Sequence, residues 1–234
     1  MDNNVTSVAI ILAAGTGKRM NSNTPKQYLT LDNKPVLYYS LRAFEESSIN
    51  EIILVVGKNE IDYCRKEIIE KYNMNKVTAI VEGGAERYDS VYQGLLTVKD
   101  TDYILIHDGA RPFITVEIIE KTLEQVVIHK ACVVGVPSKD TIKIVDAKGT
   151  VVKTPNRDNV WCTQTPQAFS FSIIYEAYKK IMAGNYPNIT DDAMVVEQTI
   201  HYPIQMIFGS YSNIKITTPE DLLIGEFMLT RPAI

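Results

Sequence analysis

The 234-residue chain has few of the residues that form disulfides or bind metal ions. Its only cysteines are Cys64, Cys132 and Cys162. With no CxxC pair and an odd cysteine left over, they fit neither a disulfide framework nor a zinc site, so we expect reduced thiols. The three histidines lack the spacing of a metal cluster or catalytic triad, and no G-x-S-x-G motif occurs. Covalent nucleophilic catalysis therefore has no support.

The sequence also lacks a long apolar run and a stripe of basic residues. The N-terminal segment "MDNNVTSVAIILAAG" has acidic and amide residues where a signal peptide needs a basic flank, and its apolar run is too short to span a bilayer. The net charge is -4, and the basic residues are dispersed, which argues against a nucleic-acid partner. We expect a cytoplasmic protein that contacts neither membrane nor nucleic acid.

A hydrophobic content of 45% supplies the material for one large buried core. Short apolar runs alternate with longer amphipathic ones, as in a parallel sheet with crossover helices. The expected strands are 8–12, 52–56, 77–81, 103–106, 131–136 and 204–208. The expected helices are 36–44, 60–72, 88–98, 116–129, 171–182, 191–198 and 217–229, the last capped by Thr218. This pattern predicts a single α/β domain over residues 1–234, Rossmann-like, with a mostly parallel twisted sheet and helices on both faces.

The alternation of strands and helices breaks at residues 138–160. This segment alternates apolar and polar residues around a "DAKG" turn, which is typical of a solvent-exposed antiparallel hairpin. An isolated two-stranded ribbon is marginally stable, so it must pack against something else. We expect a protruding β-hairpin arm that contacts a second copy of the chain in a homodimer.

A loop rich in glycine and cations follows the first expected strand. The segment "LAAGTGKRMNSNTPKQYL" matches neither a Walker A motif nor a dinucleotide fingerprint. Its small residues nevertheless allow backbone N–H groups to approach phosphate oxygens, and Arg19 and Lys26 supply positive charge. The glycines alone fit a solvated turn equally well.

Two later loops add polar groups at the same expected edge of the sheet. The segment "EGGAERYDSV" follows the third strand, and by itself it could be a tight turn that caps a helix. The segment "HDGARPF" places Asp108 at the end of the fourth strand, where one carboxylate plus substrate phosphates could hold Mg²⁺. Ligands of open α/β sheets bind outside the carboxyl ends of the strands. The three loops together predict a nucleotide triphosphate site.

Six ordered motifs carry a resemblance to a known family. They are "LAAGTGKRM...PKQYL...KPVL", "GGAERYDSV", "HDGARPF", "NRDNVWCTQTPQAF", "TDDAMVVE" and "NIKITTPEDL". Together, over residues 8–231, they closely resemble the 2-C-methyl-D-erythritol 4-phosphate cytidylyltransferases of non-mevalonate isoprenoid biosynthesis. The resemblance implies a nucleotidyltransferase that joins CTP to methylerythritol phosphate and releases pyrophosphate, with Mg²⁺, in a homodimer whose arms embrace.

The resemblance also implies roles for individual residues. The triphosphate would lie against Ala13, Ala14, Gly15, Arg19 and Lys26. The cytosine and ribose would lie against Gly84, Ala85, Arg87 and Ser90. The metal would bind Asp108, and the sugar phosphate would face Arg111, Thr165, Thr190 and Lys215. Arg157 on the arm would reach the site of the partner subunit and, with Arg19, Lys26 and Lys215, would be catalytic. Some relatives carry aspartate where Ala85 stands.

Three other functions share parts of this pattern. The sister family of ribitol 5-phosphate cytidylyltransferases has the same fold and chemistry, but its first loop tends to read AGG and its acidic motif TDAC. A non-catalytic cytidine-nucleotide-binding protein would not need all the charged residues found here. A nicotinamide-dependent dehydrogenase would need a third glycine and an acidic residue after the second strand. Only the resemblance selects cytosine over another base.

Overall fold

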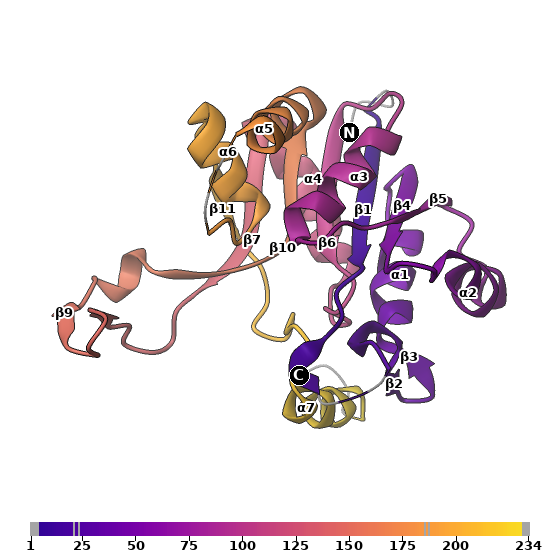
Figure 1. The fold of residues 1–234 in the computed structure, drawn as a ribbon, viewed down its shortest axis with the longest axis horizontal. Helices are drawn as coiled ribbons and strands as arrows, with labels where there is room; N and C mark the ends of the chain where they lie inside the picture. Colours follow the sequence, from indigo (N-terminus) through magenta and orange to yellow (C-terminus); the bar gives the residue numbers. More distant parts are fainter. Residues whose placement is uncertain (1–4, 21, 23, 185, 187, 231–234) are drawn as a thin grey trace.

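The computed structural model describes residues 5–20, 22, 24–184, 186 and 188–230. One seven-stranded sheet, in the order β11-β7-β10-β6-β1-β4-β5, forms the centre (Figure 1). Its strands are β1 (Ser7–Ala13), β4 (Glu51–Val56), β5 (Val77–Glu82), β6 (Tyr103–Asp108), β7 (Ala131–Pro137), β10 (Trp161–Ser170) and β11 (Gln205–Phe208). All neighbours pair in parallel except β10, which is antiparallel to β6 and to β7. The predicted mostly parallel α/β sheet is therefore confirmed.

Helices cover both faces of the sheet, as predicted. One face packs against α1 (Val36–Glu46), α2 (Ile61–Cys64) and α4 (Val116–His129). The opposite face packs against α3 (Arg87–Thr97), α5 (Phe171–Ala183) and α6 (Asp192–Ile200). Successive residues of β1 alternate between the two cores: Ile11 lies in one and Ile10 in the other, and both are fully buried. This two-sided burial explains why the central strands are continuous apolar runs.

Two expectations about individual elements need correction. The helix expected over 60–72 is continuous over 61–72, but its middle, Arg65–Glu70, is π-helical rather than α-helical. The sequence does not indicate strand β10, because its residues are largely polar and include Pro166, and proline usually argues against a central strand. The sheet accommodates Pro166 through a register shift between Thr163 and Gln167 in the pairing of β10 with β7.

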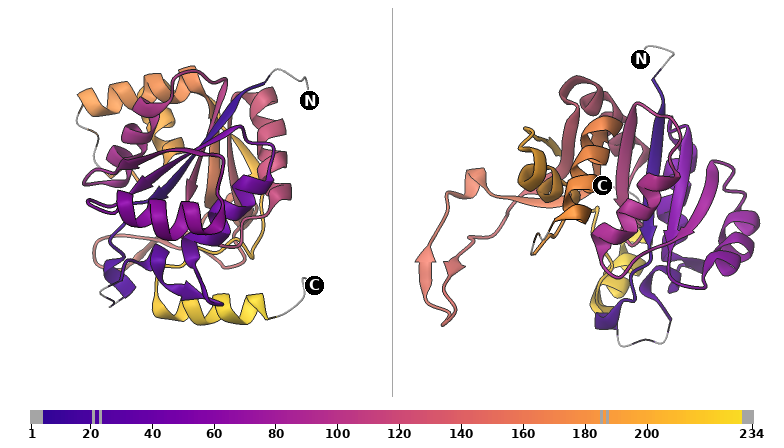
Figure 2. Two further views of the ribbon diagram at one scale, coloured as in Figure 1. Left: turned by 90° about the vertical axis from the view of Figure 1, so that its right-hand side faces the viewer. Right: turned by 45° about the horizontal axis from the view of Figure 1, so that its top comes forward.

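The arm leaves the body of the domain as a long hairpin (Figures 1 and 2). Its strands β8 (Ile144–Val145) and β9 (Val151–Lys153) are antiparallel. Gly149 has φ +82° in the turn between them, where the Asp146 side chain accepts hydrogen bonds from the N–H groups of Lys148 and Thr150. The "DAKG" turn and the hairpin are therefore confirmed. Val152 is 67% exposed, so the arm carries uncovered apolar surface.

The last helix, α7 (Pro219–Leu229), lies beyond the two helical layers, beside the small β2–β3 ribbon (Thr30–Leu31 and Lys34–Pro35) (Figures 1 and 2). Thr218 and Asp221 form a capping box, and the Asp221 carboxylate accepts the Thr218 N–H at 2.9 Å. The predicted cap is confirmed. A small cluster built from Met20, Leu31 and Ile216 fills the space under this helix.

Candidate active site

Four parallel strands end at one edge of the sheet and deliver the predicted loops there. Ala13 of β1 is opposite Val56 of β4, Val56 is opposite Glu82 of β5, and Leu12 is opposite Asp108 of β6. The loops that follow enclose a cavity of about 910 Å³. The carboxyl edge of the sheet thus carries a space large enough for a nucleotide.

Two glycines allow these loops to approach closely. Gly17 has φ +64°, a left-handed conformation that side chains rarely adopt, and it lies against the stem of Lys26. A Cβ on Gly83 would lie 2.5 Å from Cβ of Ala14 and 2.6 Å from the Ser90 hydroxyl. The loops after β1 and β5 are therefore in contact only because residue 83 has no side chain.

Lys26 lines the cavity at the start of a short 3-10 helix, Lys26–Tyr28. The next residue, Gln27, is buried and donates its side-chain amide to the carbonyl oxygen of Ala13, which fixes this turn against β1. Burial lowers the pKa of Lys26 to about 8, with further lowering by the charges of Lys215 and Arg19. Arg19 is exposed and does not line the cavity, although its charge reaches Lys26.

Asp108 is the carboxylate around which the cations gather. Lys215 Nζ lies 2.7 Å from Asp108 Oδ2, Arg87 Nε lies 3.2 Å from Oδ1, and Arg111 Nε lies 3.9 Å from Oδ2. Burial favours the neutral acid, but these three cations hold the pKa of Asp108 well below its usual range. Asp108 is therefore ionised and faces the cavity.

The segment 213–216 crosses the site and carries Lys215 to Asp108. Asn213 is fully buried; its side-chain amide donates to the Thr165 carbonyl oxygen at 2.9 Å, and its own carbonyl accepts from Arg111 Nη1 at 2.8 Å. The Ile216 N–H donates to the Ala110 carbonyl oxygen. These bonds connect the segment to β10 and to the loop after β6, which fixes the backbone on both sides of Lys215.

Arg87 joins the loop after β5 to α6. Its Nη1 and Nη2 atoms each lie 2.8 Å from a carboxylate oxygen of Asp192, and its Nε contacts Asp108. Burial disfavours the charged form of Arg87, but Asp192 and Asp108 more than offset this and raise its pKa well above the usual value. The guanidinium is therefore held between two carboxylates.

The structure brings most of the predicted site residues into one cavity. Those that line it are Ala13, Ala14, Gly15, Lys26, Gly84, Ala85, Arg87, Ser90, Asp108 and Lys215. Arg111 lies behind Asp108, and the buried Thr165 hydroxyl accepts the Asp108 N–H at 3.1 Å and contacts His107 Nδ1 at 3.0 Å. Thr190 and Arg157 are exposed outside the cavity, Thr190 just before α6 and Arg157 on the arm.

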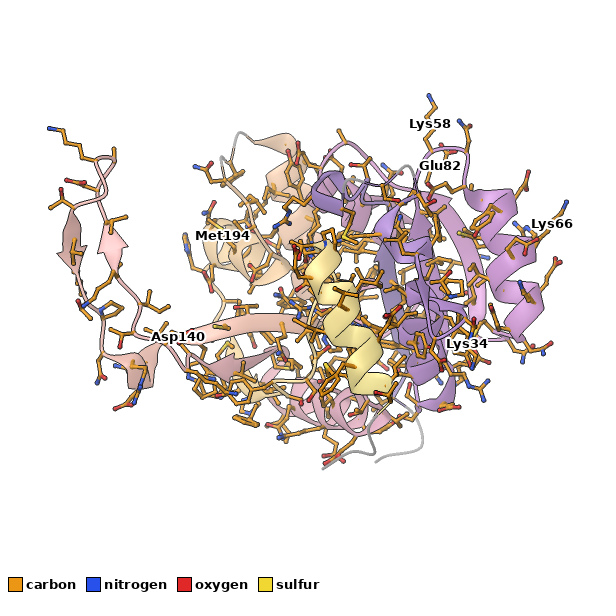
Figure 3. The ribbon with its side chains drawn as sticks, turned by 90° about the horizontal axis from the view of Figure 1, so that it is seen from below. Lys34, Lys58, Lys66, Glu82, Asp140 and Met194 are labelled. Carbon is orange, nitrogen blue, oxygen red and sulfur yellow. The ribbon has the colours of Figure 1, made fainter. Side chains whose placement is uncertain are left out.

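Several residues of the site were missed by sequence reasoning. The additional lining residues are Leu12, Thr16, Pro25, Gln27, Gly57, Lys58, Glu60, Gly83, Glu86 and Ala110. Figure 3 labels Lys58, on the loop after β4, and Glu82, the last residue of β5, whose carboxylate accepts the Asn59 N–H at 2.8 Å. Asp192 lies within the quoted motif "TDDAMVVE", but nothing in that motif indicates that its partner is Arg87, 105 positions earlier.

The Asp108 carboxylate could serve as the protein ligand of a Mg²⁺ ion held jointly with a substrate. Within the described ranges, no group of three or more His, Cys, Asp or Glu side chains could hold a metal ion. A single ionised carboxylate beside a nucleotide-sized cavity is instead an arrangement in which Mg²⁺ is commonly held together with nucleotide phosphates.

In the part of the chain that the structure describes, no helix is both long enough and apolar enough to cross a bilayer. The cytoplasmic location stays a prediction.

The α/β fold and the cation-lined cavity at the carboxyl edge of the sheet are features of enzymes that bind phosphorylated substrates. The family model for 2-C-methyl-D-erythritol 4-phosphate cytidylyltransferase matches residues 7–231. A relative of that name from Lachnoclostridium phytofermentans is 54% identical over 221 residues, which cover 94% of this chain and 95% of the relative. Another from Clostridium botulinum is 51% identical over 228 residues, which cover 95% of this chain and 99% of the relative. The chain belongs to this family.

Solved structures agree with this assignment. A 4-diphosphocytidyl-2C-methyl-D-erythritol synthase from Anaerococcus prevotii superposes with a TM-score of 0.86 at 37% identity and covers 97% of both chains. The 2-C-methyl-D-erythritol 4-phosphate cytidylyltransferase from Francisella tularensis has a TM-score of 0.78 at 31% identity, over 95% of this chain and 99% of that one.

Proposed function

We propose that the cavity at the carboxyl edge of the sheet is the catalytic site of a cytidylyl transfer. Family membership makes the chain a nucleotidyltransferase of isoprenoid biosynthesis that takes CTP and 2-C-methyl-D-erythritol 4-phosphate as substrates. This placement of the catalytic site rests on one observation: Lys26, Lys215 and Asp108 line the same cavity as the glycine loops.

The reaction sets the demands on this site. A phosphate oxygen of the acceptor forms a bond to the α-phosphorus of CTP while the bond from that phosphorus to the bridging oxygen breaks and pyrophosphate leaves. The acceptor needs no strong base, since the second pKa of a phosphate monoester is about 6. The main obstacle is repulsion between two anions, so positioning and electrostatic stabilisation should supply most of the catalysis.

The cations of the cavity meet these demands in different ways. Lys26, with the exposed Arg19 behind it, would stabilise the charge that develops on the triphosphate. Lys215 and Arg111 would attract the incoming phosphate, since both lie beside Asp108 at the end of β6. The loop from Ala13 to Gly17 would present backbone N–H groups to phosphate oxygens.

Asp108 would hold a Mg²⁺ ion shared with the triphosphate, for which Lys215 would have to give up part of its contact with Asp108. When bound, the ion would neutralise negative charge and fix the orientation of the phosphate oxygens. Thr165 supports this role, because its hydroxyl binds the Asp108 N–H and so fixes the backbone at that residue.

The arm supports the proposal of a homodimer. Apolar side chains of β8 and β9 are about half exposed in the single chain, which leaves them available to a second copy. Arg157 lies at the end of the arm segment, away from its own cavity, and would contribute to the site of the partner subunit. Mixing a Lys26 variant with an Arg157 variant should restore some activity in verified heterodimers; no recovery would place Arg157 in its own subunit.

A pyrophosphate-release assay tests the reaction directly. CTP, UTP, ATP and GTP are each combined with methylerythritol phosphate and with ribitol phosphate, with and without Mg²⁺. We expect release with CTP and methylerythritol phosphate only, and no release after chelation of the metal. Turnover of ribitol phosphate at a similar rate would assign the sister activity, and turnover with every base would contradict cytosine recognition.

A further inference from the structure

Arg87 uses all of its guanidinium nitrogens on two carboxylates. Nη1 and Nη2 bind the two oxygens of Asp192 as a symmetrical fork, while Nε faces one oxygen of Asp108 at 3.2 Å. A fork of this kind fixes the plane of the guanidinium as well as its position. Arg87 and Asp108 line the cavity, whereas Asp192 does not.

Asp192 is held firmly behind the cavity. It is fully buried, and the Tyr178 hydroxyl donates to its Oδ1 at 2.6 Å. Burial and the neighbouring carboxylate raise the pKa of Tyr178 well above its usual value, so the hydroxyl remains a donor. Asp191 caps α6 by accepting the Met194 N–H, which fixes the backbone beside Asp192.

The charge balance explains why Arg87 needs this second carboxylate. Three cations already approach Asp108, and Lys215 and Arg111 both face its Oδ2. If Asp192 were neutral, Asp108 would be the nearest remaining carboxylate for the whole Arg87 fork. A bidentate contact there would occupy both Asp108 oxygens and leave neither for a divalent cation.

We propose that Asp192 is a positioning residue that holds the two terminal nitrogens of Arg87 away from Asp108. Arg87 then contacts only one oxygen of Asp108, and the other can pass from Lys215 to the metal ion that accompanies the nucleotide. This inference rests on the proposed metal role of Asp108. It assigns to the acidic motif at the start of α6 a part in metal binding without any contact between that motif and the metal.

The test measures metal-assisted nucleotide binding in the absence of acceptor, so that no turnover occurs. The dissociation constant of CTP is determined by calorimetry with and without Mg²⁺, and the ratio of the two values is the coupling. Asp192→Asn should reduce the coupling by about tenfold, within the usual range of linked binding. Arg87→Gln combined with Asp192→Asn should bring the coupling back to that of Arg87→Gln alone, since no arginine then competes for Asp108.

Controls separate positioning from general loss of structure. Asp191→Asn removes a neighbouring charge but keeps an effective helix cap, and its coupling should equal that of the wild type. Tyr178→Phe removes one hydrogen bond to Asp192 and should reduce the coupling by roughly two- to threefold. If Asp192→Asn does not fold, the coupling measured in Tyr178→Phe tests the inference instead.

The outcomes distinguish this inference from the proposed function. Coupling in the wild type that disappears in Asp108→Asn supports the metal role of Asp108, whereas an absence of coupling in the wild type, or its persistence in Asp108→Asn, overturns that role. With the metal role intact, unchanged coupling in Asp192→Asn and Tyr178→Phe overturns the positioning role of Asp192. A double variant that stays as weak as Asp192→Asn overturns it as well.

Discussion

Replacing Lys26 by methionine should weaken catalysis and strengthen the fold at the same time. Methionine keeps an unbranched stem against Gly17 but removes the charge from the cavity. Loss of one donor from a preorganised site commonly costs on the order of 10²- to 10³-fold in rate, and we expect kcat to fall by that amount. The fold should gain stability, because the ammonium is held among other cations in a partly buried place.

The pKa of Lys26 sets the size of this gain. Its displacement from 10.5 to about 8 corresponds to at most about 3.5 kcal/mol, at about 1.4 kcal/mol for each pKa unit. Solvent screening at a partly exposed side chain reduces this to about 1–2 kcal/mol. For a chain of this size that gain corresponds to a rise in Tm of roughly 3–6 °C.

The pH dependence identifies the cause. Because the pKa is lower in the folded state, the unfolded chain binds more protons between pH 8 and 10.5, and the stability of the wild type rises with pH over that window. The advantage of Lys26→Met should be complete at pH 7 and should shrink towards pH 10. Urea unfolding at both pH values measures it. A variant that is less stable than the wild type at pH 7, or a difference that does not change with pH, would refute this reasoning.

Three further substitutions test other contacts of the site. Asp108→Asn should lower stability at pH 7 by about 3–5 kcal/mol, measured by urea unfolding, since it leaves buried cations without their counter-charge. Because the depressed pKa of Asp108 contributes stability that is lost as pH falls below about 4, this variant should also lose less stability on acidification than the wild type does. Thr165→Val should cost about 1–3 kcal/mol and should reduce turnover, because the Asp108 N–H loses its acceptor, and Thr165→Ser should restore both. Gly83→Ala should weaken CTP binding in calorimetry by about tenfold, because its Cβ would lie 2.5 Å from that of Ala14 and would force the two nucleotide-binding loops after β1 and β5 apart.

The parts of the site that follow strand ends could be predicted from the sequence. Apolar runs locate the strands, and parallel strands bring their carboxyl ends to one edge, so the loops with Lys26, Arg87 and Asp108 had to converge. The periodicity of apolar residues did not indicate strand β10, where polar residues and a proline interrupt the pattern. Strand β10 lies between two buried strands although Pro166 interrupts it, because the register shift at Thr163 leaves the rest of its ladder intact.

The partnership between Arg87 and Asp192 shows where such reasoning ends. No local sequence pattern around either residue indicates its partner, because the Arg87–Asp192 ion pair joins the start of α3 to the start of α6 on the same face of the sheet. A buried carboxylate is costly unless a cation and hydrogen bonds satisfy it, so once α6 buries Asp192, a cation must reach it from another element. Arg87, the first residue of α3, supplies that cation, and its guanidinium also reaches Asp108 at the end of β6. The charge of Asp192, which lies in the packing of α6, thus becomes part of the electrostatics of Asp108 through Arg87, and only the assembled sheet reveals that connection.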